Sequence, residues 1–120
     1  MRRTGPTNIH LRLLVAYLRK QARAHGAPIW RYVAELLLKP RRQRIAVNIS
    51  KINRYTNPNE TVVVPGKVLG SGKLEHPVTV AAWSFSKKAL EKIVKAGGKA
   101  IYIHEFIEQN PRGSNVKILR

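Results

Sequence analysis

The stretch Val62–Phe85, VVVPGKVLGSGKLEHPVTVAAWSF, decides how the rest of the chain is organised. Short apolar runs with many β-branched residues, bounded by turn-forming residues, are typical of buried strands. We therefore predict strands at Val62–Val64 and Val78–Ala82. The loop between them contains three glycines, a serine and two lysines: Gly66, Gly70, Ser71, Gly72, Lys67 and Lys73. Because glycine allows close approach of the backbone and lysine supplies positive charge, we expect this loop to contact a polyanion.

Two other interpretations of this loop can be weighed. A nucleotide-binding P-loop needs Gly, four residues and then Gly-Lys-Ser/Thr. Counting back from Gly72, the first glycine position holds Lys67, and Leu74 has no hydroxyl for a magnesium ion. A nucleotide site is therefore excluded. A surface turn without a partner remains the alternative, because most Gly/Ser turns are only turns.

The composition indicates a folded and strongly basic protein. The chain has 120 residues, which predicts a single domain, and its 43% hydrophobic content supports a real core. Lys and Arg number 23 against six acidic residues, for a net charge of +17. Nucleic acid is the usual partner for such an excess, and membrane surfaces and acidic proteins are the other candidates. No apolar run approaches 18 residues, so we expect no membrane span.

The positive charge is concentrated in the first half of the chain. Residues 1–54 contain thirteen Lys and Arg residues and one acid, Glu35, whereas residues 55–120 contain ten basic and five acidic residues. Ten of the twelve arginines also lie in the first part. Arginine's planar guanidinium suits contact with phosphates and bases, so we expect most nucleic-acid contact there.

The N-terminal segment predicts a basic arm followed by an amphipathic helix. Arg2 and Arg3 belong to the arm, Thr7 or Asn8 is a plausible N-cap, and the helix is expected to run to Ala24. Its buried face has helical spacing: Leu11, Leu14, Val15, Leu18 and Ala22. Its basic stripe consists of Arg12, Arg19, Lys20 and Arg23. We expect the stripe to contact RNA, with a solvated surface as the alternative.

A second helix is expected after Gly26, with Pro28 in its first turn and Trp30 as a packed anchor rather than a base-stacking surface. The densest basic cluster follows and contains Lys39, Arg41, Arg42 and Arg44. Such charges repel one another without a counterion partner, which favours RNA contact over a solvated turn. Alternating Ile45, Val47 and Ile49 predict a strand, and Lys51 and Arg54 extend the positive surface beyond it.

The chain after Phe85 predicts further short elements. Ser86 is expected to cap a helix that runs to about Ala96 and stops at Gly97-Gly98. Its inward residues are predicted to be Ala89, Leu90, Ile93 and Val94, and its outward residues Lys87, Lys88, Lys92 and Lys95. A strand at Ala100–Ile103, a helical turn at His104–Gln109 and a closing strand at Val116–Leu119 complete the chain.

Catalytic patterns are missing from the sequence. The four histidines are far apart, and His104-Glu105-Phe106-Ile107-Glu108 has glutamate where a zinc-binding HExxH motif needs its second histidine. The chain contains no cysteine, which excludes disulfides, thiolate metal ligands and cysteine nucleophiles. We therefore expect no enzyme activity, no metal, no cofactor and no small-molecule substrate.

Three stretches together resemble ribosomal protein 18e of the archaeal and eukaryotic large subunit. They are Lys39–Ile52 (KPRRQRIAVNISKI), Val64–Leu74 (VPGKVLGSGKL) and Asn110–Arg120 (NPRGSNVKILR). The resemblance extends over nearly the whole chain, and the short length is similar to the archaeal version. It adds Arg112 in the last stretch to the expected RNA contacts.

The resemblance implies an α/β (α+β) fold shared with bacterial large-subunit ribosomal protein 15. A basic helical segment and first strand, residues 1–54, would precede an irregular ββα core, residues 55–120, within a single domain of residues 1–120. The implied role is structural: binding large-subunit ribosomal RNA beside neighbouring ribosomal proteins, in the cytoplasm. A DNA-compacting chromatin protein and an RNA-modifying or RNA-cleaving enzyme are the competing hypotheses.

Overall fold

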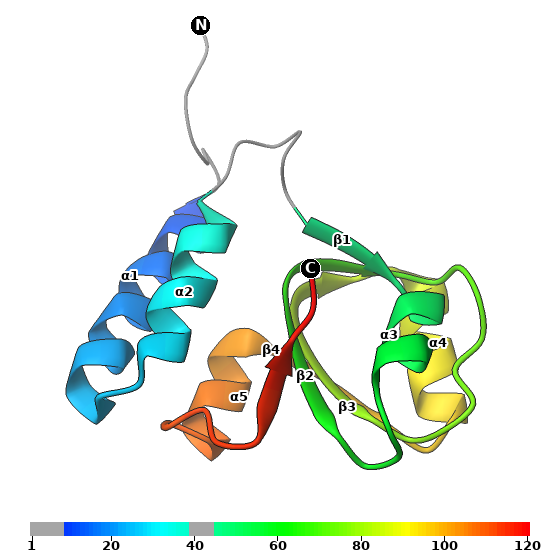
Figure 1. The fold of residues 1–120 in the computed structure, drawn as a ribbon. Helices are drawn as coiled ribbons and strands as arrows, with labels where there is room; N and C mark the ends of the chain where they lie inside the picture. The colour runs from blue at the N-terminus through cyan, green and yellow to red at the C-terminus, as the bar shows by residue number, and fades with distance from the viewer. Residues whose placement is uncertain (1–8, 39–44) are drawn as a thin grey trace, which may run out of the picture.

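The computed structural model describes residues 9–38 and 45–120, and its centre is a parallel β-sheet with helices on both faces (Figure 1). This architecture confirms the α/β class. The described residues form five strands, β1 (Ile45–Asn48), β2 (Thr61–Leu69), β3 (Thr79–Phe85), β4 (Lys99–Tyr102) and β5 (Val116–Ile118). They also form five helices, α1 (Ile9–His25), α2 (Pro28–Leu37), α3 (Ile49–Tyr55), α4 (Lys87–Lys95) and α5 (Ile103–Gln109). The order β2, β3, α4 gives the expected ββα core.

Strand β2 organises the sheet, because three other strands pair with it. The strand order is β1-β2-β3-β4, and β5 also pairs with β2. Strand β3 runs along one edge of β2. The opposite edge is shared: β5 pairs with its first half, where Thr61 is opposite Val116, and β1 with its second half, where Ile45 is opposite Gly66. The stretch that decides the fold therefore supplies the central strand.

Strand β2 continues further than the sequence predicted. A register shift between Val64 and Lys67 lets the strand accommodate Pro65, which has no backbone N–H to donate. Gly66 and Lys67, which were assigned to the loop, consequently lie in β2, and the true connection to β3 begins at Gly70. That assignment was wrong because a bulge that tolerates proline has no clear sequence signature.

The two faces of the sheet bury different residues of the same strands. Val63 of β2 and Ala81 of β3 lie in one core cluster with α1, α2 and α5. Val62, Val64 and Val80 lie in the other cluster, with Ile52 of α3 and Ile93 of α4. Alternating side chains point to opposite faces of a strand, so continuous apolar runs are what a sheet covered on both faces requires.

The ends of the helices follow from individual residues. Gly26 ends α1 with φ +57°, and Pro28 opens α2. The hydroxyl of Ser86 accepts a hydrogen bond from the backbone N–H of Ala89, which caps α4, and Gly97 follows that helix with φ +86°. These predicted ends are confirmed.

Two local predictions were wrong. Ile49 begins helix α3 instead of ending a strand, because Ile49 and Ile52 both turn into the core at helical spacing. In α4, Ala89 and Ile93 are fully buried, but Leu90 is 36% and Val94 67% exposed. The single-domain expectation for residues 1–120, with its division at residue 54, stays a prediction.

Candidate nucleic-acid interface

The predicted basic stripe of α1 lies on the surface. Leu11, Leu14 and Leu18 bury one side of the helix in the core cluster that α1 forms with α2, α5 and one face of the sheet. The stripe, Arg12, Arg19, Lys20 and Arg23, is exposed on its other sides. Since these side chains are free of the core, their charge is available to a partner. Six other predicted contact residues lie outside the described residues: Arg2, Arg3, Lys39, Arg41, Arg42 and Arg44.

Helix α3 presents the next basic residues on the opposite face of the sheet. Arg54 is exposed, and its guanidinium lies 5.8 Å from the centroid of the Tyr55 ring. Lys51 is partly buried, and its Nζ donates a 2.5 Å hydrogen bond to the carbonyl oxygen of Arg120. Arg54 is thus the more accessible of the two, whereas Lys51 also holds the C-terminal residue against α3.

The glycine loop packs directly beside α3. The backbone N–H of Ser50 donates a 3.0 Å hydrogen bond to the carbonyl oxygen of Ser71. The Asn53 amide donates to a Glu75 carboxylate oxygen, and the Glu75 N–H donates to Asn53, both at 2.9 Å. These contacts place Arg54 and the exposed Lys73 on neighbouring segments, so α3 and the loop form one surface.

The fold itself requires glycine at Gly66, Gly70 and Gly72, because there is no room for a Cβ at these positions. A Cβ on Gly66 would lie 2.1 Å from the carbonyl oxygen of Ile45 in the neighbouring strand β1. A Cβ on Gly70 would lie 2.5 Å from that of Lys88, and Gly72 has φ +98° with Ser50 equally close. Internal packing therefore explains all three glycines without a partner. Lys67, Ser71 and Lys73 remain exposed, so the predicted polyanion contact now depends on them.

Lys92 of α4 holds the loop from the other side. Its ammonium donates hydrogen bonds to the carbonyl oxygens of Gly70, at 2.5 Å, and Gly72, at 2.6 Å. The charge of Lys92, which was predicted to point outward, is thus used within the protein.

The last predicted contact, Arg112, lies in the turn before β5. This turn packs on the start of α2: the indole of Trp30 donates a 2.7 Å hydrogen bond to the carbonyl oxygen of Pro111, and Gly113 lies against Ile29. Arg112 itself is exposed. Trp30 is fully buried, which confirms its prediction as a packed anchor.

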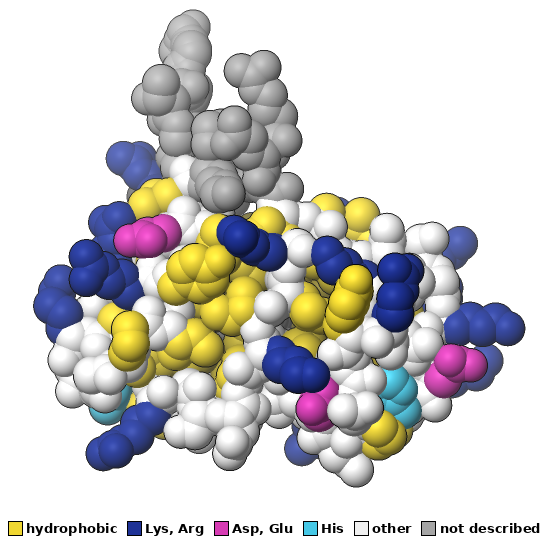
Figure 2. Space-filling view, viewed as in Figure 1, with side chains coloured by type: hydrophobic (Ala, Val, Ile, Leu, Met, Phe, Trp, Pro, Cys, Tyr) yellow, Lys and Arg dark blue, Asp and Glu magenta, His cyan; other side chains and the backbone are white. Residues whose placement is uncertain are grey.

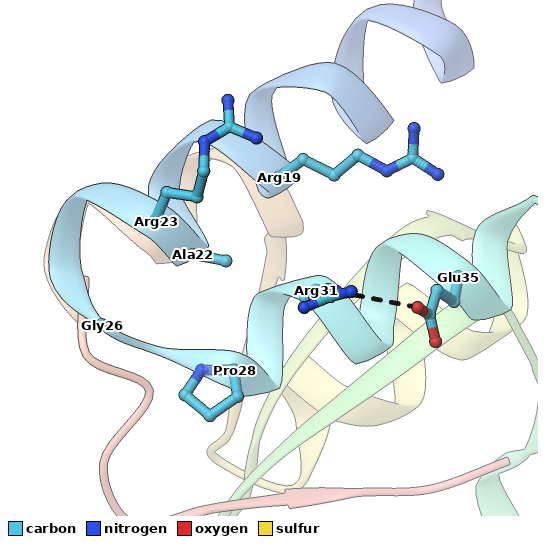
Figure 3. A pocket seen from close by; sticks show the side chains of 7 residues that line it. All are labelled: Arg19, Ala22, Arg23, Gly26, Pro28, Arg31 and Glu35. Carbon is cyan, nitrogen blue, oxygen red and sulfur yellow. Dashed lines mark ion pairs between the residues drawn. The ribbon is translucent and has the colours of Figure 1, made fainter.

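A crevice between α1 and α2 brings together charged residues from both helices (Figure 3). Its volume is about 620 Å³. Arg19 and Arg23 come from α1, and Arg31 and Glu35 from α2, while Ala22, Gly26 and Pro28 line the end where the helices are joined. Arg31 was not among the contacts predicted from the sequence. The short turn after His25 was the available signal, because it makes α1 and α2 an antiparallel pair.

The basic side chains are spread over the surface of the molecule. Figure 2 shows Lys and Arg over the outer side of α1 and α2, over the end formed by α3 and α4, and also on the face between these ends, with few acidic side chains among them. The helices at the two ends cover opposite faces of the sheet. The predicted site residues therefore lie on both faces of the sheet.

The described residues give no support to other kinds of site. Within residues 9–38 and 45–120, no three His, Cys, Asp or Glu side chains lie close enough to hold a metal ion. Across the same residues, no helix is long and apolar enough to cross a membrane. His25 pairs with Gln21 at 3.0 Å, and His76 Nε2 lies 2.8 Å from the Thr56 hydroxyl, so both have structural partners.

Comparison with known proteins gives one consistent family. The family described as "Ribosomal protein 60S L18 and 50S L18e" matches residues 1–120. Proteins named "Large ribosomal subunit protein eL18" are similar along almost their whole length. That of Sulfurisphaera tokodaii is 54% identical, with 98% of this chain and 97% of the relative covered. That of Pyrobaculum aerophilum is 51% identical, with 97% and 95% covered, and that of Archaeoglobus fulgidus 50%, with 99% of each. The chain therefore belongs to the family of ribosomal proteins 60S L18 and 50S L18e.

Proposed function

We propose that this protein is a structural constituent of the large ribosomal subunit, in the cytoplasm, where it binds and joins separate segments of large-subunit ribosomal RNA. One observation carries the joining role: exposed basic side chains lie on helices that cover opposite faces of the sheet. A rigid sheet between two positive surfaces holds two RNA segments at a fixed separation. The family and its named relatives support the ribosomal role.

The first surface is the exposed stripe of α1, and the second is formed by α3 and the loop that follows β2. Arg12 and Lys20 represent the first surface, and Arg54 and Lys73 the second. Lys67 lies in β2 and lines a hollow with Leu11 and Leu37, on the face of the sheet that α1 and α2 cover. Lysine and arginine bind phosphate oxygens and release condensed counterions, which gives affinity without reading base sequence. Shape and 2′-hydroxyl contacts then select folded RNA. The remaining contacts predicted from the sequence within the described residues are Arg19, Arg23, Lys51, Gly66, Gly70, Ser71, Gly72 and Arg112.

No catalytic step belongs to this proposal. The family is one of ribosomal proteins and not of enzymes. Its other partners are neighbouring large-subunit ribosomal proteins, and we propose no small-molecule substrate. The alternative of a DNA-compacting protein lacks a supporting observation, because the relatives are named as ribosomal proteins.

The joining role can be tested by directed cleavage, because the chain contains no cysteine. Ala24→Cys places a single thiol beside the α1 stripe, and Ser71→Cys places one on the loop beside α3. Each variant would be labelled with an iron chelate and bound to large-subunit RNA transcribed from Sulfurisphaera tokodaii. We expect cleavage of two different RNA segments. Cleavage of one shared segment would contradict the joining role, and no binding to the RNA would contradict the function itself.

The ribosomal assignment is tested separately by sucrose-gradient fractionation of native cell extract in low and high salt. We expect the protein at one copy per large subunit, and we expect it to remain there in moderate salt. Recovery with nucleoid DNA would favour the chromatin alternative.

A further inference from the structure

The crevice between α1 and α2 has the side chains of an anion site, but the one anionic group of the protein that lines it, the Glu35 carboxylate, forms only a weak ion pair. Three arginines line it, Arg19, Arg23 and Arg31, against the one carboxylate of Glu35. The Arg31 Nε lies 3.9 Å from the Glu35 Oε2, and these side chains are 74% and 59% exposed. An ion pair so long and so exposed contributes little, so a stronger anion can displace it.

The other two arginines of the crevice, Arg19 and Arg23, form no ion pair with any described residue. They are four residues apart on α1, so they lie on the same side of that helix and repel each other unless an anion lies between them. Positive groups on both walls of a hollow also concentrate the field more than the same charges on a flat surface do.

The shape of the crevice suits a phosphate backbone. At the end where the helices join, its lining is small: Ala22, Gly26 and Pro28. A Cβ on Gly26 would meet nothing within 4 Å, so the space there is open. Planar guanidinium groups bind phosphate oxygens through two parallel hydrogen bonds, which ammonium groups do not match.

We infer that the α1–α2 crevice binds phosphate groups of an RNA strand, which take the place of Glu35 as the partner of Arg31. This inference rests on the proposed function and deepens it, since it names a built subsite on the first surface. It assigns a phosphate contact to Arg31, and the Glu35 carboxylate then competes with the RNA phosphate for the Arg31 guanidinium.

The first test keeps the net charge constant. The triple variant Arg19→Lys, Arg23→Lys, Arg31→Lys retains all three positive charges but loses the paired hydrogen bonds to phosphate. Affinity for the Sulfurisphaera tokodaii large-subunit RNA would be measured by filter binding at fixed salt. We expect about tenfold weaker binding. All three side chains are on the surface, and far-UV circular dichroism checks that the variant is folded.

The second test has the opposite sign. Glu35→Gln removes the competing anion, and about threefold tighter binding is expected. Glu91→Gln on α4 is the matched control, because it changes the net charge equally on the opposite face of the sheet. A general charge effect would tighten both variants alike, and that result would overturn the inference.

These experiments distinguish failure of the proposed function from failure of the crevice as a phosphate site. If the wild-type protein fails to bind the RNA, the proposed function and this inference are both wrong. If the wild type binds and the triple lysine variant binds equally well, the crevice is not a phosphate site, and the proposed function stands. Weaker binding of the lysine variant together with selective tightening by Glu35→Gln supports the inference.

Discussion

The indole Nε1 of Trp30 donates a 2.7 Å hydrogen bond to the carbonyl oxygen of Pro111, although 81 residues separate the two in sequence. This contact connects α2 with the turn before β5. Trp30→Phe removes the donor and leaves a void beside Phe106, whose ring centroid lies 6.0 Å away. We expect a decrease of about 2 kcal/mol in the free energy of unfolding, measured by urea denaturation.

The matched control for Trp30 is Trp83→Phe. Trp83 is only half-buried on β3. This substitution should cost less than about 1 kcal/mol, because less apolar surface is removed from the core. Equal decreases for the two variants would show that the hydrogen bond to Pro111 adds nothing.

Substitution of Gly72 should lower the stability of the protein, and any effect on RNA binding should follow from that loss. Its φ of +98° is strained for any other residue, and a Cβ there would lie 2.4 Å from the Cβ of Ser50. We expect Gly72→Ala to destabilise the protein by about 2 kcal/mol or more in urea denaturation. Ser71→Ala, whose exposed side chain is not used in the loop contacts, should cost less than about 0.5 kcal/mol. A Gly72→Ala protein of normal stability that binds RNA poorly would restore the glycine's role in close approach to RNA.

Lys92 should hold the loop, because its ammonium binds two loop carbonyl oxygens. Lys92→Met removes both hydrogen bonds and keeps the apolar part of the side chain. We expect amide hydrogen exchange at Ser50, which donates to Ser71 of the loop, to become about fivefold faster. Lys95→Met on the exposed side of α4 is the control and should leave this exchange unchanged.

Glu60 should make stability depend on pH. Hydrogen bonds from the backbone N–H of Asn57 and from Lys117 hold the pKa of Glu60 below its ordinary value of 4.5. Below pH 4.5, the unfolded chain therefore takes up this proton more readily than the folded chain. The stabilisation is complete at neutral pH and disappears as the pH falls through the folded pKa.

Denaturant titrations of the wild type and of Glu60→Gln at several pH values check this sign. The wild type should be more stable at neutral pH, and the difference should shrink as the pH falls below 4.5. A difference that grows in acid would contradict the prediction.

The basic cluster around Arg41 should contribute to the salt dependence of RNA binding. Replacing Arg41, Arg42 and Arg44 with alanine is expected to weaken binding to large-subunit RNA. For each phosphate that the variant no longer neutralises, the slope of log K against log salt should flatten by about 0.7–0.9. Filter binding across a salt series measures this slope, and an unchanged slope would remove the cluster from the interface.

Sequence patterns were sufficient where local physics decides the structure. The spacing of Leu11, Leu14 and Leu18 predicted the buried side of α1, and Ser86 and Gly97 predicted the ends of α4. The family resemblance implied the ββα core after an N-terminal helical segment. Exposure of the α1 arginines followed directly from the position of the apolar face.

Patterns were insufficient where tertiary contacts decide. Strand β2 continues past Pro65 only because its register shifts there, and Ile49 belongs to a helix because the core beneath it accepts Ile52 as well. Arg31 joins Arg19 only after two helices have packed. The glycines suggested close approach by a partner, whereas the approaching groups are Ile45, Lys88 and Ser50 of the same chain.

The pairing of β2 with β5 has a consequence for synthesis. The first half of β2 receives one of its two neighbours from residues 116–118, and Trp30 receives its acceptor from residue 111. Synthesis proceeds from the N-terminus, so the arginine-rich residues 1–54 leave the ribosome before either of these contacts can form. Completion of the fold is therefore delayed until residue 118 is released, and RNA that meets the chain earlier meets an incompletely packed helical hairpin.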